Sequence, residues 1–183
     1  MKRPAAIIGF TGYAGAGKDT AAAALVARGY TRLAFADRLR EILLAVDPLI
    51  PVPGTATFAR LSAVIADRGW QAAKMEIGEV RDLLQRLGTE GGRDVLGPNV
   101  WIDATFARIT TRGRYVVTDV RFDNEAERIR ALGGHVYRIV RPGVGPINAH
   151  ATEAGISEHL IAGTITNGGT VAALTQEAAR LTT

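Results

Sequence analysis

The sequence has no cysteine, which excludes disulfide bonds and thiolate metal sites and is typical of proteins of a reducing cytoplasm. It also has no internal repeat and no apolar run that approaches the length needed to span a bilayer. The apolar run at residues 5–10 is too short for a signal peptide. These absences predict a globular cytoplasmic protein without a membrane partner.

Neither sign of charge dominates the chain. Its 183 residues include 22 Lys and Arg against 18 Asp and Glu, which gives a net charge of +4 and a pI near 9.8. Such a pI can indicate nucleic-acid binding, but the arginines are scattered singly and form no tail or stripe. We therefore expect a pocket for polyanionic small molecules and no stable binding of nucleic acid.

A glycine-rich segment follows the first apolar run, at residues 12–20 (Gly-Tyr-Ala-Gly-Ala-Gly-Lys-Asp-Thr). Its glycines and lysine fit a phosphate-binding loop between a buried strand and a helix. Glycines let backbone N–H groups approach a polyphosphate, while the helix N-terminus and the lysine add positive charge. The predicted phosphate-binding residues are Gly12, Ala14, Gly15, Ala16, Gly17, Lys18, Asp19 and Thr20.

The residue after the lysine departs from the usual pattern. A Ser or Thr normally stands there and places its hydroxyl at Mg²⁺, but this chain has Asp19, with Thr20 one place later. Because a carboxylate beside phosphates is unfavourable, we expect Asp19 to point outward near the first helical turn. We assign the hydroxyl at the metal to Thr20.

Short apolar runs alternate with helical patterns along most of the chain. The expected strands are residues 5–10, 31–35, 114–119, 135–140 and 160–166. This alternation predicts a single P-loop NTPase-type α/β domain over residues 1–183, a three-layer α/β/α arrangement with a parallel sheet of about five strands. Ligands of such folds bind outside the carboxyl ends of the strands.

Residues 36–112 interrupt the alternation. Residues 58–113 have helical spacing and no strand signal, and residues 50–57, with two prolines and a glycine, are expected to form a loop. We therefore predict that residues 36–112 form an inserted helical region on the substrate side. A second Pro- and Gly-rich segment, residues 141–155, is expected to act as a lid.

The strand expected at 114–119 ends in Asp119, and Arg121 follows two residues later. An acid there, in a chain with a phosphate loop, matches the second magnesium-organising element of P-loop NTPases; a helix cap or an arginine-paired acid is the alternative for Asp119. Arg121 would point into the same cleft and could clasp a phosphate, unless it is a solvated surface residue. We predict that Lys18, Asp119 and Arg121 are catalytic and that Thr20 and Asp119 meet Mg²⁺, directly or through water.

Phosphoryl transfer needs donor and acceptor held in line and the charge of the transferred group neutralised. Further basic residues could contribute to this. Arg81 and Arg93 are candidates on the acceptor side, with Lys74 in addition, and Arg138 and Arg141 near the expected lid could close over the phosphates.

Several segments, in order along nearly the whole chain, carry a resemblance to a known family. Besides the phosphate loop they are residues 35–40, 80–90, 118–125 and 165–170. Arg93 and Trp101, which follow the segment at 80–90, also match. They resemble the deoxynucleoside monophosphate kinases of tailed bacteriophages, within the nucleoside monophosphate kinase group. An Asp followed by a Thr after the lysine is this family's own form of the loop.

The resemblance implies a kinase that moves the γ-phosphate of ATP to a deoxynucleoside 5′-monophosphate with Mg²⁺, giving ADP and the diphosphate. It also implies a homodimer in the cytoplasm, of the host cell if the gene is from a phage. The acceptor-binding candidates that it adds or supports are Phe35, Asp37, Lys74, Arg81, Gln85, Glu90, Arg93, Trp101 and Arg121.

Three details of the resemblance leave alternatives open. Trp101 could stack on a base or sugar, or lie in the core. The turn at residues 167–169 could touch the adenine through its backbone, or be a plain turn. His150 and Glu153 belong to a motif near the expected lid whose role does not follow from the sequence.

Other classes of protein fit less well. Dephospho-coenzyme A kinase or another small-metabolite kinase would share the loop and lid but would not need the block at 84–90. A nucleotide-switched GTPase would carry an Asn-Lys-x-Asp motif and an Asp-x-x-Gly after the strand, and this sequence has neither. Only the pI suggests a DNA-associated P-loop protein.

Overall fold

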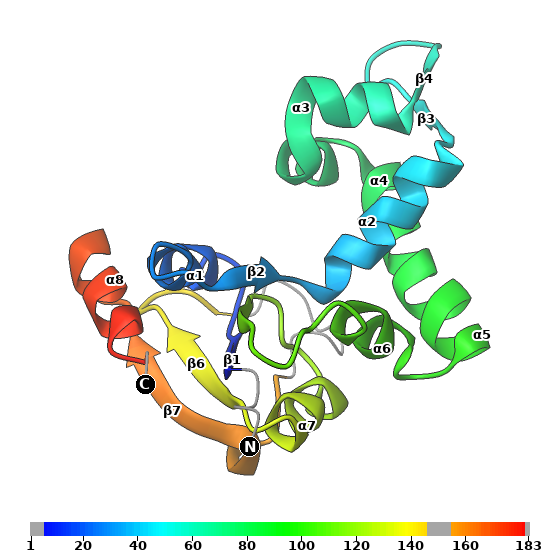
Figure 1. Cartoon of the computed structure of the whole chain (residues 1–183). Coiled ribbons are helices and arrows are strands. Elements are labelled where there is room, and N and C mark those ends of the chain that lie inside the picture. The colour runs from blue at the N-terminus through cyan, green and yellow to red at the C-terminus, as the bar shows by residue number, and fades with distance from the viewer. Residues whose placement is uncertain (1–5, 146–154, 182–183) are drawn as a thin grey trace. The chain divides into compact units, whose positions relative to one another are not determined.

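The computed structural model describes residues 6–145 and 155–181 of the chain (Figure 1). They form two compact units, which we call the sheet unit (residues up to Phe35 and from Thr105 onward) and the helical unit (Ala36–Ala104). The chain passes from one to the other within helix α2 (Phe35–Val46) and returns within helix α6 (Val100–Phe106).

The sheet unit is built on five parallel strands in the order β2-β5-β1-β6-β7. Their bounds are β1 Ala6–Thr11, β2 Thr31–Leu33, β5 Arg114–Val117, β6 His135–Val140 and β7 Ile161–Thr166. The predicted five-stranded parallel sheet is therefore confirmed. Gly9 of β1 and Leu33 of β2 both pair with Val117 of β5, so these three strands end at the same edge.

Helices cover both faces of this sheet. Helices α1 (Lys18–Val26) and α8 (Val171–Ala179) share a core with Ile8 and Phe10 of β1. Gly9, which points to the other face, lies against Ile129 of helix α7 (Asp123–Ala131), where an added Cβ would be 2.8 Å from the Ile129 Cδ1. Successive residues of a strand point to opposite faces, so the unit has the predicted three layers (Figure 1).

Helix α1 follows from its composition and its end signal. Five of its nine residues, Lys18–Val26, are alanine or leucine, which have high helix propensity. Gly29 after it has φ +84, and its N–H donates to the Val26 carbonyl while the Tyr30 N–H donates to the Leu25 carbonyl. Gly29 thus ends the helix in a left-handed conformation.

The helical unit contains more than helices. Its elements, besides most of α2 and α6, are β3 Leu49–Pro51, β4 Phe58–Arg60, α3 Leu61–Glu76, α4 Gly78–Arg86, the π-helix η1 Leu87–Arg93 and α5 Asp94–Leu96. Strands β3 and β4 form an antiparallel hairpin. Residues 52–57 form the expected loop, but residues 50–51 belong to β3, and the expected absence of a strand from residue 58 onward is wrong because 58–60 form β4. The strands are three residues long, and Pro51 lies exposed at an edge, where proline is tolerated.

The core of the helical unit is separate from that of the sheet unit. Its fully buried members include Ile50 of the hairpin, Leu61 and Ala73 of α3, and Val80 of α4. Helix α3 is broken at Gly69, whose φ of +72 is not helical. The glycines at positions 88, 91 and 92 lie within the π-helix that continues α4.

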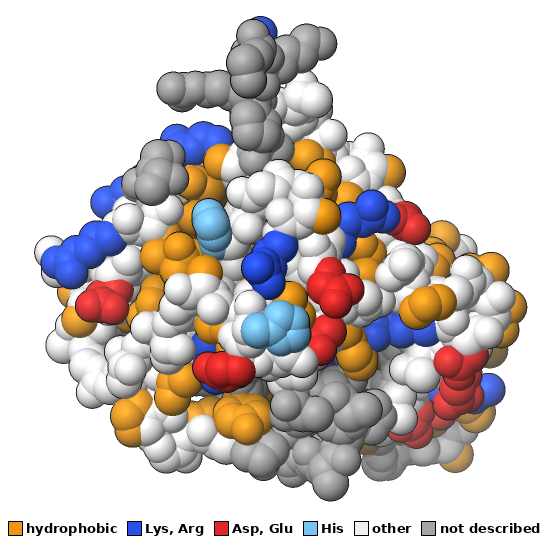
Figure 2. Space-filling view, turned by 90° about the horizontal axis from the view of Figure 1, so that it is seen from below, with side chains coloured by type: hydrophobic (Ala, Val, Ile, Leu, Met, Phe, Trp, Pro, Cys, Tyr) orange, Lys and Arg blue, Asp and Glu red, His pale blue; other side chains and the backbone are white. Residues whose placement is uncertain are grey.

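The surface charges agree with the scattered arginines of the sequence. On the face shown in Figure 2, basic and acidic side chains alternate over the surface and gather into no single stripe. Across the described ranges, no helix has the length and apolar character of a membrane span.

Candidate active site

The phosphate loop leaves β1 at Thr11 and enters α1 at Lys18. Gly12, Gly15 and Gly17 have φ values of +130, +79 and +105, which side chains rarely adopt. Space also excludes side chains at two of them. A Cβ on Gly12 would lie 2.2 Å from the Ile139 carbonyl oxygen, and one on Gly17 would lie 2.6 Å from the Asn167 Nδ2, whereas Gly15 faces open space.

Lys18 folds back over its own loop. Its Nζ donates to the carbonyl oxygens of Gly12, at 2.7 Å, and Tyr13, at 2.8 Å. Burial lowers the pKa of the Lys18 amine, and the nearby Arg121 cation lowers it further, while Asp19 and Asp119 act in the opposite direction. The structure therefore brings together Lys18, Asp119 and Arg121, the three residues predicted to be catalytic.

Asp119 and Arg121 stand on the segment that leaves β5 between the ends of β1 and β2. The Thr118 N–H donates to the Leu33 carbonyl on one side, and the Val120 N–H donates to the Phe10 carbonyl on the other. The half-buried Asp119 accepts a hydrogen bond from the Phe35 N–H at its Oδ1, at 2.9 Å. The backbone thus holds this carboxylate at the carboxyl edge of the sheet.

Arg121 is exposed, and a buried glutamate holds its backbone. Glu125, only 1% exposed, accepts hydrogen bonds at Oε2 from the N–H groups of Arg121, at 2.7 Å, and Phe122, at 3.2 Å. This role of Glu125 was not predicted from the sequence, although a Glu three residues after a helix start is a capping signal.

Asp123 does not cap α7, whose N-cap residue is Phe122. It is the first residue of the helix, and its carboxylate instead accepts from the N–H of Ser157, at 2.7 Å, and the hydroxyl of Ser157, at 2.5 Å. These two hydrogen bonds lower the pKa of the Asp123 carboxyl. The interaction ties the start of α7 to the chain just before the 3₁₀ helix η3 (Glu158–Leu160).

The first turn of α1 carries Asp19 and Thr20. Asp19 is exposed, as expected for an acid that points away from the phosphate site, and Thr20 is half-buried. The position of Thr20 at the helix start is compatible with the metal role assigned to it, which stays a prediction.

Of the expected lid at residues 141–155, residues 146–154 lie outside the described residues. His150 and Glu153 are among them. Arg138 of β6 forms an ion pair with Glu158, at 2.7 Å, so its charge already has a partner. Arg141 is exposed just after β6. A contact of either arginine with ATP stays a prediction.

The acceptor candidates of the helical unit lie on several elements. Asp37 pairs with Arg40 on α2, at 3.2 Å, and Lys74 is half-buried in the last turn of α3. Arg81 and Gln85 are exposed on α4. Glu90 and the half-buried Arg93 are on the π-helix, a rare form often found at functional sites. Phe35, the remaining aromatic candidate, is buried in the sheet unit edge-to-face against Phe106, with ring centroids 5.7 Å apart.

Trp101 is a core residue of the helical unit. Its side chain is 3% exposed, and its indole N–H donates to the Gly88 carbonyl, at 2.8 Å. A Cβ on Gly92 would lie 2.4 Å from the ring, so the glycine is needed to admit the tryptophan. Of the two alternatives for Trp101 the structure favours the core, because a buried ring offers no face for a base, and we remove it from the acceptor candidates.

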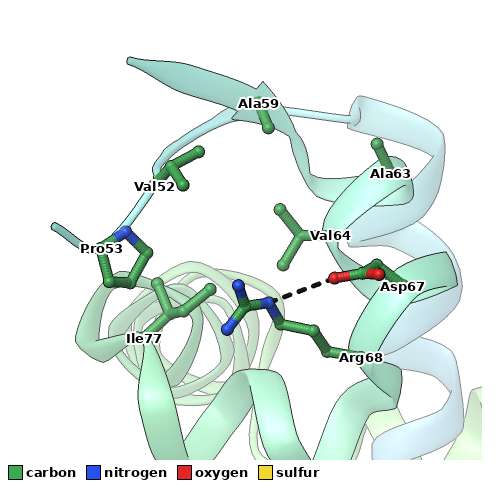
Figure 3. Close-up of a pocket in the computed structure, with 8 residues that line it drawn as sticks. All are labelled: Val52, Pro53, Ala59, Ala63, Val64, Asp67, Arg68 and Ile77. Atoms are coloured by element: carbon green, nitrogen blue, oxygen red, sulfur yellow. Dashed lines mark ion pairs between the residues drawn. The ribbon is translucent and has the colours of Figure 1, made fainter. Parts of the chain in front are cut away.

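A cavity of about 200 Å³ lies in the helical unit between the hairpin and α3 (Figure 3). Val52, Ala59, Val64 and Ile77 give it a mainly apolar lining. Arg68, a cation that lines it, is paired with Asp67 and, at 2.6 Å, with Glu76. Among the described residues, none of those predicted to bind nucleotide lines this cavity, so it is distinct from the candidate site.

Comparison with known proteins gives the family. A model of the deoxynucleotide monophosphate kinase family matches residues 57–178, a range that excludes the phosphate loop. The chain is also 33% identical to a candidate deoxynucleotide monophosphate kinase of Acanthamoeba polyphaga mimivirus, over 80% of each chain.

Solved structures with some similarity include an APS kinase of Mycobacterium tuberculosis, at 14% identity over 98% of this chain and 97% of that one, with a TM-score of 0.42. Another is TT1252 from Thermus thermophilus, at 20% identity over the whole of both chains, with a TM-score of 0.43. The P-loop α/β fold rests on the parallel sheet and loop of this structure, and the family rests on the family model and the viral relative. This chain therefore belongs to the deoxynucleotide monophosphate kinase family and is a nucleotide kinase.

Proposed function

We propose that this kinase transfers the γ-phosphate of ATP to a deoxynucleoside 5′-monophosphate, giving ADP and a deoxynucleoside diphosphate. The observation that carries the proposal is the position of two cations beyond the strand ends: Lys18 follows the glycine-rich loop, and Arg121 follows the segment held between β1 and β2. Arg121 is close enough to lower the pKa of the Lys18 amine, while Asp19 and Asp119 act in the opposite direction. Because each cation attracts an anionic group, Lys18 is assigned to a phosphate of the donor and Arg121 to the phosphate of the acceptor.

On the donor side, the loop and α1 bind the phosphates of ATP. The Lys18 ammonium binds carbonyl oxygens of its own loop. Phosphate oxygens are stronger acceptors for an ammonium than neutral carbonyls are. ATP therefore draws the lysine toward its outer phosphates, while the N–H groups at the start of α1 bind the inner ones.

Thr20 and Asp119 are suited to hold Mg²⁺. A hydroxyl and a carboxylate are hard oxygen donors, and Mg²⁺ in kinase sites is bound by one or two such groups together with water and phosphate oxygens. No cluster of three or more His, Cys, Asp and Glu side chains able to hold a metal occurs in the described part of the chain. That agrees with a metal carried mainly by the nucleotide. When bound, Mg²⁺ would neutralise part of the charge on the transferred group.

On the acceptor side, Arg121 binds the phosphate of the monophosphate. Its guanidinium remains charged at every working pH and can donate two parallel hydrogen bonds. The hydrogen bond from its backbone to buried Glu125 fixes the point from which the side chain extends. Arg121 thus supplies both a binding contact and positive charge where negative charge develops.

The helical unit is proposed to bind the rest of the acceptor nucleotide. The candidates on its elements stay predictions: Asp37, Lys74, Arg81, Gln85, Glu90 and Arg93. Phe35, in the sheet unit, also stays a predicted acceptor contact. A homodimer, a phage origin and the absence of stable nucleic-acid binding also stay predictions.

The proposal is tested by measuring ADP release from ATP and Mg²⁺ in the presence of each deoxynucleoside monophosphate. We expect turnover well above the ATP hydrolysis background with at least one of them. The same assay with dephospho-coenzyme A as acceptor is the control for the alternative kinase. Background rates with all the monophosphates would contradict the proposed function.

A further inference from the structure

Asn167, in the turn between β7 and α8, contacts the phosphate loop. Its Nδ2 donates to the Ala16 carbonyl oxygen, at 2.9 Å, across 151 residues of sequence. The acceptor is a carbonyl, so the side-chain group that faces it must be the NH₂. Ala16 is 1% exposed and Asn167 is half-buried, so this hydrogen bond is partly shielded from competing water.

The backbone of Asn167 is itself fixed. Its N–H donates to the Val140 carbonyl at 2.7 Å, which joins the ends of β6 and β7. Gly17 lies close to the Asn167 amide and to Leu174 of α8. A Cβ added to Gly17 would be 2.6 Å from the Asn167 Nδ2 and 3.0 Å from the Leu174 Cδ2. The side chain therefore reaches the loop from a rigid part of the sheet.

The geometry of the peptide bond shows the effect of this contact. The Ala16 carbonyl and the Gly17 N–H belong to one planar trans peptide, and in such a peptide the two bonds point in opposite directions. A hydrogen bond that holds the Ala16 oxygen toward Asn167 therefore holds the Gly17 N–H away from it. Gly17 has φ +105 and directly precedes α1, so it has considerable freedom to rotate without such a restraint.

We propose that Asn167 is a positioning residue that aims the N–H of Gly17 into the phosphate site, so that the loop is preformed before ATP binds. This inference rests on the proposed function of the loop and adds a residue to it. The role differs from reading of the adenine by the 167–169 turn, because it acts on phosphates whatever the base.

The variants Asn167→Ala and Asn167→Leu remove the donor, and the second keeps most of the side-chain volume. Thr170→Ala is the matched control: Thr170 caps α8 by accepting a hydrogen bond from the Ala173 N–H, at 3.2 Å, in the same turn. Dissociation constants for ADP and for inorganic tripolyphosphate, together with Tm, are measured for the wild type and the three variants.

We expect both Asn167 variants to bind ADP and tripolyphosphate about 5- to 10-fold more weakly, with similar losses for the two ligands. Thr170→Ala should lower Tm and leave both affinities unchanged. A loss for ADP alone, no loss for either ligand, or an equal loss in Thr170→Ala would overturn the proposal. So would a wild-type protein that binds ADP but not tripolyphosphate, since a preformed loop does not need the base. A wild-type protein that binds neither ligand contradicts the proposed function itself.

Discussion

The two units of this kinase present their candidate residues in different ways. In the sheet unit, Lys18, Asp119 and Arg121 come together because parallel strands end at one edge and backbone hydrogen bonds fix the segments beyond the strand ends. In the helical unit, the acceptor candidates lie on helices. Trp101 and Gly88, which belong to the family resemblance, instead hydrogen-bond each other within the unit. The residues at the strand ends were located by sequence patterns, whereas the acceptor residues on the helices stay predictions.

The sharpest test of the backbone-built site compares two glycines of the loop. Gly12→Ala places a Cβ 2.2 Å from the Ile139 carbonyl oxygen at φ +130, so we expect loss of nucleotide binding and about 3 kcal/mol or more of stability. Gly15→Ala meets open space and only the strain of a positive φ, about 1–2 kcal/mol. ADP affinity and chemical denaturation measure both. Equal effects of the two substitutions would contradict the steric account.

Removal of the Lys18 charge should cost about 10²- to 10³-fold in kcat, because it stabilises charge on the transferred phosphoryl group. Among the described residues, the hydrogen-bond acceptors of the Lys18 Nζ are two carbonyl oxygens of its own loop. We therefore expect Lys18→Ala to unfold at nearly the wild-type temperature. Steady-state kinetics and thermal melting check this. Wild-type kcat in the variant would remove Lys18 from the catalytic residues.

Arg121→Ala should lower kcat/KM for the monophosphate by about 10- to 100-fold, the effect of losing a charge-assisted hydrogen bond. The affinity for ATP should change little, since the loop supplies that binding. Arg112→Ala, which removes another exposed arginine of the sheet unit, is the control and should behave as wild type. A loss of ATP affinity as large as the loss of acceptor turnover would place Arg121 on the donor side instead.

Trp101→Phe tests the assignment of a helical-unit residue to the core. The variant loses the hydrogen bond to the Gly88 carbonyl and some buried area, so stability should fall by about 1–3 kcal/mol. The KM for the acceptor should stay within about twofold of wild type. A raised KM at an unchanged unfolding midpoint would return Trp101 to the acceptor site.

The smallest effect concerns acid stability. The pKa of Asp123 lies below its ordinary value of 3.8 because Ser157 hydrogen-bonds the carboxylate. The charged carboxylate therefore stabilises the folded protein fully above about pH 4, and this stabilisation is lost as the pH falls through the lower folded-state pKa. The difference in Tm between wild type and Asp123→Ala should therefore shrink below about pH 4. A difference that stays constant from neutral pH down to strong acid would show that the charge of Asp123 has no part in it.

The sequence predicts much of the sheet unit for a physical reason. Apolar runs, glycines and the strand-to-loop order are local signals, and they located the strands and the phosphate loop. The exposure of Asp19 followed from charge repulsion by the phosphates. The hairpin at residues 49–60 was missed because strands of three residues, one of which ends in Pro51, carry no alternation to detect. The π-helix was missed because its glycines normally end helices.

The supporting residues of the site were not predictable in the same way. Asn167 reaches the loop from 151 residues away, and Glu125 acts through the backbone of Arg121, so each contact exists only after the chain has folded. A turn sequence or a helix-start Glu shows that such a residue is present. It does not show which backbone group the side chain will hold.

The most direct test of the central claim follows the transferred phosphate. Wild-type protein is incubated with ATP labelled at the γ-phosphate, Mg²⁺ and the monophosphate that gives the highest turnover, and the products are separated. The account predicts label in the deoxynucleoside diphosphate, in step with ADP formation and lost in Lys18→Ala. Label recovered only in inorganic phosphate, with no labelled diphosphate, would contradict it.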